Sequence, residues 1–98
     1  MVFDVSKVAG ISDFKKKTEK ERALFLVQEK VFLVVNKNTI EIRCDSRLSK
    51  FLQEKYESVM ESRYFGHGGI EIVMSGQLAE NEVEDLVRLS YNLSKAEE

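Results

Sequence analysis

The residues best suited to chemistry in this chain stand in one glycine-rich stretch around its single histidine. Gly66, His67, Gly68 and Gly69 follow one another, and consecutive glycine amides can point together at a phosphate or an oxyanion. The stretch lacks the Lys-Ser/Thr pair that follows the glycines of a P-loop, and the chain has no second histidine for a metal or a proton relay. A flexible connection into a following strand is the alternative, and the sequence favours it over an anion-binding loop.

The other reactive side chains also lack catalytic partners. The only cysteine, Cys44, alternates with Ile40 and Ile42, so we expect it to face the core as a protonated, apolar filler. The acids at the start of the last predicted helix are expected to be solvated, because a metal needs converging oxygens. We therefore expect a protein without enzyme activity, metal or cofactor.

Positive charge is concentrated in the first half of the chain. Residues 1–50 carry 11 Lys and Arg against 7 Asp and Glu, and residues 51–98 carry 4 against 10, which gives +4 and −6. This asymmetry can indicate an anionic partner, so one hypothesis is a nucleic-acid-binding module. The basic residues of that hypothesis are Lys15, Lys16, Lys17, Lys20, Arg22 and Arg43, with Phe25 and Phe32 as stacking platforms for single strands. A solvated segment is the favoured alternative, since the net charge of −2 is not that of a typical nucleic-acid-binding domain.

Length and composition indicate one small folded domain. The 98 residues suffice for a single core, and 43% are hydrophobic while 33% are charged. A lone cysteine is typical of a reducing compartment, and we find no export signal and no stretch long enough to cross a membrane. We expect a soluble, cytoplasmic protein with one domain over residues 1–98.

The elements that must position these residues begin with the apolar run 23–35. It predicts two strands, 24–27 and 31–35, followed by a strictly alternating strand 40–44 and a further strand 70–74 ended by Ser75-Gly76. Apolar residues spaced by three and four predict helices over 48–57 and 79–93, the first capped by Asp45 or Ser46. Residues 1–22 form a short helix or an ordered arm. The prediction is an α+β two-layer sandwich, with an antiparallel sheet of about four strands, two main helices on one face, and the order β-β-β-α-β-α.

Register arithmetic divides the apolar run between two faces. A turn centred on Lys37-Asn38 pairs Leu33 with Ile42 and Val35 with Ile40, and a turn at Glu29-Lys30 pairs Leu26 with Leu33. The residues left for the opposite face are Phe25, Val27, Phe32 and Val34.

An apolar face of this size usually marks an interface. The leading hypothesis is therefore a non-enzymatic module that binds a protein partner or a second copy of itself, as a homodimer, through that face. The alternative is that residues 1–22 fold across the face and seal it with their apolar side chains. Those side chains are Phe3, Val5, Val8, Ile11 and Phe14.

Several segments together resemble a known family. They are the strand opening Lys30-Val31-Phe32-Leu33-Val34, the strand 40–44 leading into the helix 48–57, Ser62-Arg63, the strand 70–74, Ser75-Gly76-Gln77-Leu78, and Leu86 with Ser90-Tyr91. From Lys30 onward the chain resembles the MmcQ/YjbR family of small uncharacterised proteins, often described as DNA-binding. The resemblance implies an antiparallel sheet with helices packed on it, of the secretion-chaperone-like kind, and adds nucleic-acid binding as a suggestion.

Overall fold

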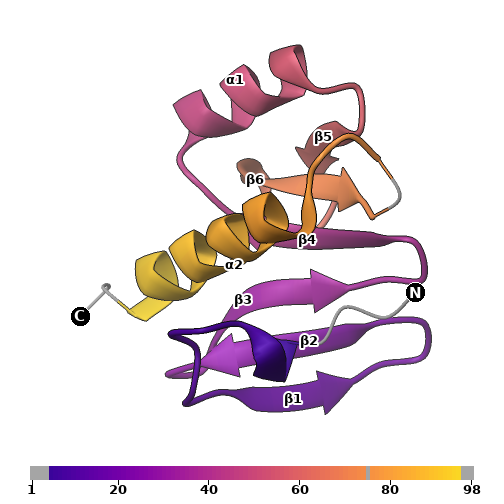
Figure 1. Ribbon diagram of the computed structural model, residues 1–98. Helices are drawn as coiled ribbons and strands as arrows, with labels where there is room; N and C mark the ends of the chain where they lie inside the picture. The colour runs from indigo at the N-terminus through magenta and orange to yellow at the C-terminus, as the bar shows by residue number, and fades with distance from the viewer. Residues whose placement is uncertain (1–4, 75, 96–98) are drawn as a thin grey trace.

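The protein forms a six-stranded antiparallel sheet with two α-helices packed on it, as a computed structural model of the chain shows (Figure 1). The structure describes residues 5–74 and 76–95. Its elements are the 3₁₀ helix η1 (Val5–Lys7), β1 (Lys15–Thr18), β2 (Ala23–Val27), β3 (Lys30–Val35), β4 (Thr39–Arg43), α1 (Ser46–Lys55), β5 (Val59–Ser62), β6 (Gly66–Val73) and α2 (Glu80–Lys95). The strands lie in the order β1-β2-β3-β4-β6-β5. The predicted α+β class with an antiparallel sheet is confirmed.

The two edge strands of the sheet, β1 and β5, were not predicted from the sequence. β1 has the sequence KKKT and is exposed along its whole length, so no apolar alternation marks it. It exists because its backbone pairs with β2. β5 (Val59–Ser62) follows the predicted helix 48–57 after a single residue and alternates too briefly to be recognised as a strand. That helix, α1, ends at Lys55, and Tyr56 is already extended.

The turn that follows β3 lies where the sequence placed it. Leu33 pairs with Ile42 and Val35 with Ile40, as predicted. The β2–β3 turn instead consists of Gln28 and Glu29, both with positive φ, as in the tight turns that join antiparallel strands. A register shift between Phe25 and Leu26 then leaves Phe32 as an extra residue in β3.

This turn and bulge overturn the predicted apolar outer face. Phe25 pairs with Leu33 on the side that faces the helices, and Val27, two residues further along, lies on the same side. The bulge turns Phe32 toward α2, where its ring meets Tyr91 edge-on at 5.1 Å. Phe25, Val27 and Phe32 are all buried in the core. Placing them with Val34 on one uncovered face was therefore wrong.

The N-terminal segment contributes to this core. Val5, Val8 and Ile11 are buried in it, and Phe14 packs edge-on against Phe25 at 5.7 Å. In Figure 1 the segment around η1 lies in front of β1 and β2, beside α2. Residues 5–14 thus cover part of the predicted apolar set, but on the helix side of the sheet, so the alternative that residues 1–22 seal the opposite face is wrong for the described residues. Phe3 lies outside the described residues.

The face of the sheet away from the helices, here called the outer face, carries Leu24, Val34, Glu41 and Glu71 in one row of directly paired residues. Val34 therefore does lie on the predicted face, but it is fully buried. Neither helix in the described part of the chain is long and apolar enough to cross a membrane.

Candidate functional site

Two carboxylates lie side by side on the outer face. β4 and β6 each carry an Ile-Glu-Ile triplet, and the two triplets pair so that Glu41 stands directly opposite Glu71. Glu41 is 1% exposed and Glu71 is 3% exposed. Buried charges facing each other are costly unless each is compensated by hydrogen bonds or a countercharge, so the donors around this pair decide what it can do.

Glu71 is compensated by an arginine. Arg63 donates from Nε to Oε1 at 3.0 Å and from Nη2 to Oε2 at 2.7 Å, and Thr39 Oγ1 donates to Oε2 at 2.7 Å. Burial by itself would raise the pKa of Glu71, but the hydrogen bonds from Arg63 and Thr39 outweigh it and lower that pKa below its ordinary value. Glu71 is therefore an ionised anchor that fixes the Arg63 guanidinium.

Glu41 is compensated by neutral donors. Its Oε1 accepts from Ser62 Oγ at 2.7 Å and from the Tyr64 amide at 2.8 Å, while Oε2 accepts from Asn36 Nδ2 at 2.9 Å. Asn36 Nδ2 also lies 3.0 Å from Thr39 Oγ1. Glu41 thus joins the β3–β4 turn to the segment that links β5 and β6.

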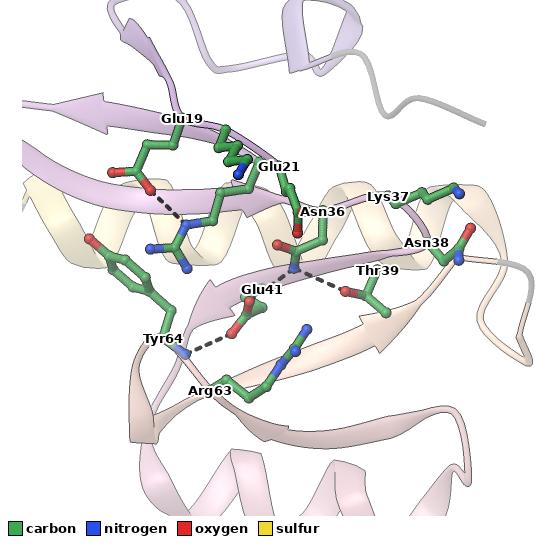
Figure 2. A pocket seen from close by; sticks show the side chains of 11 residues that line it. Glu19, Glu21, Asn36, Lys37, Asn38, Thr39, Glu41, Arg63 and Tyr64 are labelled. Atoms are coloured by element: carbon green, nitrogen blue, oxygen red, sulfur yellow. Dashed lines mark hydrogen bonds and ion pairs between the residues drawn. The ribbon is translucent and has the colours of Figure 1, made fainter.

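An open hollow of about 1210 Å³ lies above Glu41, where three chain segments meet (Figure 2). They are the β1–β2 turn, the β3–β4 turn and the β5–β6 connection. The residues lining the hollow are Glu19, Lys20, Glu21, Arg22, Asn36, Lys37, Asn38, Thr39, Glu41, Arg63 and Tyr64. Hydrogen bonds or ion pairs hold the side chains of Glu19, Arg22, Asn36, Thr39, Glu41 and Arg63 in this wall.

Two arginines from different chain segments line the hollow, and each is held by its own carboxylate. Arg22 Nε donates to Glu19 Oε1 at 2.7 Å, and its guanidinium carbon lies 5.2 Å from the centre of the Tyr64 ring. Arg63 is held by Glu71 as described above. The hydrogen bonds to Glu19 and Glu71 raise the pKa of Arg22 and of Arg63 respectively, and the charge of Glu41 adds to both increases. Both guanidinium groups therefore lie near the same buried carboxylate.

The predicted glycine-rich loop is the start of β6. Gly66 has a positive φ, and His67 is 90% exposed with Nδ1 3.3 Å from Glu61 Oε1. The Gly68 amide donates to the Phe65 carbonyl, and a Cβ on Gly69 would collide with the Ile42 carbonyl oxygen. The glycines thus serve strand pairing and the close packing of Phe65. Residues 66–69 therefore belong to the strand itself and not to a flexible connection that precedes it.

The predicted basic residues divide between the two faces. Lys15 and Lys17 pair with Leu26 and Leu24 and so lie on the outer face, whereas Lys16 pairs with Phe25, with Nζ 5.9 Å from its ring centre. Lys20 and Arg22 line the hollow. Arg43 is half-buried on the outer face, where its Nε donates to the Val31 carbonyl and its guanidinium lies 5.0 Å from the Phe65 ring centre.

Neither predicted stacking ring is available. Phe25 is 6% exposed and Phe32 is fully buried. Tyr64, at 38% exposure, is an exposed aromatic ring that lines the hollow on the outer face.

Cys44 is buried as predicted, and burial raises the pKa of its thiol to about 11. The thiol therefore stays protonated and unreactive at neutral pH. Among residues 5–74 and 76–95, no three His, Cys, Asp or Glu side chains come together as a metal site.

Four residues of this site were not expected from the sequence: Glu41, Glu71, Arg63 and Tyr64. One sequence feature could have pointed to the first two. The Ile-Glu-Ile triplet occurs twice in strands with an inward-facing isoleucine pattern, and two such triplets in register must bring their glutamates together on the other face. That Arg63 and Tyr64 join them depends on β5 lying beside β6.

The comparisons with known proteins concern the fold. No family model matches the chain, and no curated protein matches it significantly. The structure is similar to the crystal structure of a protein from Pseudomonas syringae, a structural-genomics target, with a TM-score of 0.72 and 16% sequence identity. The similarity covers 83% of this chain and 86% of that protein. At this identity the likeness establishes a shared fold.

Proposed function

We propose that this protein is a non-enzymatic binding module and that its ligand occupies the hollow on the outer face. The observation that carries the proposal is the pair of buried, hydrogen-bonded glutamates beneath the hollow. Buried carboxylates cost free energy unless they are fully compensated, and here the compensation ties the β3–β4 turn and the β5–β6 connection together around one concave surface. A rigid wall of this kind reduces the ordering cost of binding.

The side chains of the hollow are suited to recognition through charge and hydrogen bonds. Arg22, Arg63 and Tyr64 are partly or largely exposed, while Glu41 is fully occupied by its donors. The hollow offers no cysteine or histidine as a nucleophile or base. Binding is therefore a better account of this surface than covalent chemistry.

A ligand screen followed by nuclear magnetic resonance tests the proposal. Small polar molecules of positive, negative, zwitterionic and neutral type are titrated into ¹⁵N-labelled protein. Binding at the hollow is expected to shift the amide signals of Asn36, Thr39 and Tyr64. Ligands that shift only the amides of α1 and α2 would contradict the proposal.

The nucleic-acid hypothesis remains a second candidate, because Lys15, Lys17 and Arg22 lie on or beside the outer face together with the exposed ring of Tyr64. Membership of the MmcQ/YjbR family, a prediction from the sequence, would favour it. Single-stranded oligonucleotides should then bind with an affinity that grows with length and falls steeply with salt. A Lys15→Ala/Lys17→Ala variant should bind the oligonucleotides more weakly. Its affinity for a small ligand confined to the hollow should not change.

A further inference from the structure

We infer that the ligand of the hollow carries an oxyanion, a carboxylate or a phosphate group, which Arg22 and Arg63 bind together. The inference rests on the proposed function, since it assigns a chemical class to the ligand of that same hollow. It follows from which donors of the hollow are already used and which are left.

The two guanidinium groups are held in place, but each still has N–H donors without an acceptor in the described chain. Arg22 uses Nε for Glu19, and its remaining contact in the described chain is the Tyr64 ring. Arg63 uses Nε and Nη2 for Glu71. Arginine has five N–H donors in a rigid fork, so Nη1 and Nη2 of Arg22 and Nη1 of Arg63 have no acceptor among the described residues. Fixed forks with unused donors match the geometry of carboxylate and phosphate oxygens.

Most carboxylates of the site are unavailable to a ligand, because they are buried or already bound to donors of the protein. Glu41 is 1% exposed and already accepts three hydrogen bonds. Glu71 is 3% exposed and bound to Arg63 and Thr39. Glu19 is committed to Arg22. A cationic ligand would therefore find Glu21 as the one carboxylate of the hollow that is exposed and not bound to a described partner.

The positive charges are accessible by contrast. The Arg63 side chain is 75% exposed and that of Arg22 is 39% exposed. Lys20 and Lys37 are exposed at the ends of the β1–β2 and β3–β4 turns and also line the hollow. The lining holds four cations and three carboxylates, Glu19, Glu21 and Glu41. Since Glu19 and Glu41 are already bound to donors of the protein, an entering ligand meets more accessible positive than negative charge, which favours an anion.

The test is a titration of the wild-type protein, followed by amide nuclear magnetic resonance. Inorganic phosphate and acetate are the two anion probes, and putrescine is the cation probe, all at the same low ionic strength. Phosphate or acetate should shift the amides of Tyr64, Thr39 and Asn36, and the difference between the two anions distinguishes phosphate from carboxylate ligands. Shifts of these amides with putrescine but with neither anion would overturn the inference while leaving the hollow as the binding site. No shift at the hollow with any probe or screened molecule would overturn both.

Variants separate the arginines from general charge. Arg22→Gln and Arg63→Gln should each weaken anion binding about tenfold, the loss expected for one charged hydrogen-bond donor. Arg47→Gln, which removes an exposed cation from α1, is the matched control and should bind as the wild type does. If all three Arg→Gln variants bound the anion equally weakly, the loss would be due to net charge, which would contradict the inference. Arg63→Lys keeps the charge but loses the fork, so it should also bind more weakly, and it serves if Arg63→Gln does not fold.

Discussion

Replacing Ser90 by alanine is expected to destabilise this fold more than its small change in volume implies. Ser90 lies on α2, is fully buried, and bridges the helix to two strands. Its Oγ donates to the Phe32 carbonyl at 2.6 Å and accepts from the Arg43 amide at 2.8 Å. Phe32 is the extra residue of the bulge in β3, where the regular ladder is interrupted. Ser90 therefore supplies a hydrogen bond that the sheet does not.

The expected cost follows from the two backbone groups left behind. Each buried group that loses its partner costs about 1 to 3 kcal/mol, so Ser90→Ala should lower the free energy of unfolding by about 2 to 6 kcal/mol. A domain of this size has about 5 to 15 kcal/mol in total, and 1 kcal/mol corresponds to roughly 4 to 8 °C in Tm. A fall in Tm of at least about 8 °C is expected.

Ser94 provides a matched control one helical turn later. Its Oγ is also buried, yet it has no hydrogen-bond partner in the described chain. Ser94→Ala removes an unsatisfied hydroxyl and introduces a better helix former, so stability should stay the same or rise by up to about 1 kcal/mol. Urea unfolding of both variants, with unchanged m-values, measures the difference. Substitutions at exposed surface positions usually change stability by less than about 0.5 kcal/mol. A change this small for both Ser90→Ala and Ser94→Ala would refute the bridging role of Ser90.

Three further predictions concern other parts of the structure. Gly69→Ala should cost about 1 to 3 kcal/mol by overpacking, because its Cβ would collide with the Ile42 carbonyl oxygen. Gly68→Ala, whose Cβ meets nothing nearer than 3.6 Å, should cost less in the same urea experiment. Glu71→Gln should lose stability relative to the wild type at pH 7, since the lowered pKa of Glu71 means that its ionised form stabilises the fold. That deficit should shrink as the pH falls below the ordinary value of 4.5, and a deficit equal at pH 7 and pH 3 would argue against an ionised anchor. Cys44, with a pKa of about 11 and a buried thiol, should react with a disulfide reagent at pH 8 only after unfolding. Reaction at the rate of free glutathione would contradict this.

Local patterns were enough to predict the middle of the chain. The strict alternation of Ile40, Glu41 and Ile42 after an Asn-rich turn identified β4 and its register with β3, because side chains in a strand alternate between faces. Asp45 caps α1 by accepting from the Arg47 amide, as its residue type predicts. The inward position of Cys44 followed from the same alternation.

The bulge could not be read from the sequence. Phe32 and Leu33 are neighbours in an unbroken apolar run, and a period of two assigns them to opposite faces. Both face the helices because β3 accommodates an extra residue against β2, and Ser90 of α2 stabilises its carbonyl. A one-residue change of register moved Phe25 and Val27 into the core. The predicted apolar interface disappeared with it.

The sequence alone thus determined the fold class and the β3–β4 hairpin, since these depend on contacts between residues close in the chain. Only the tertiary structure decided the edge strands, the bulge and the site. Glu41 and Glu71 stand 30 positions apart and meet because β6 lies beside β4, and Arg22 reaches the same hollow from the β1–β2 turn, nearer the β1 edge of the sheet. Pairing between such distant segments is set by the combined burial of both sheet faces, which no single stretch of sequence encodes.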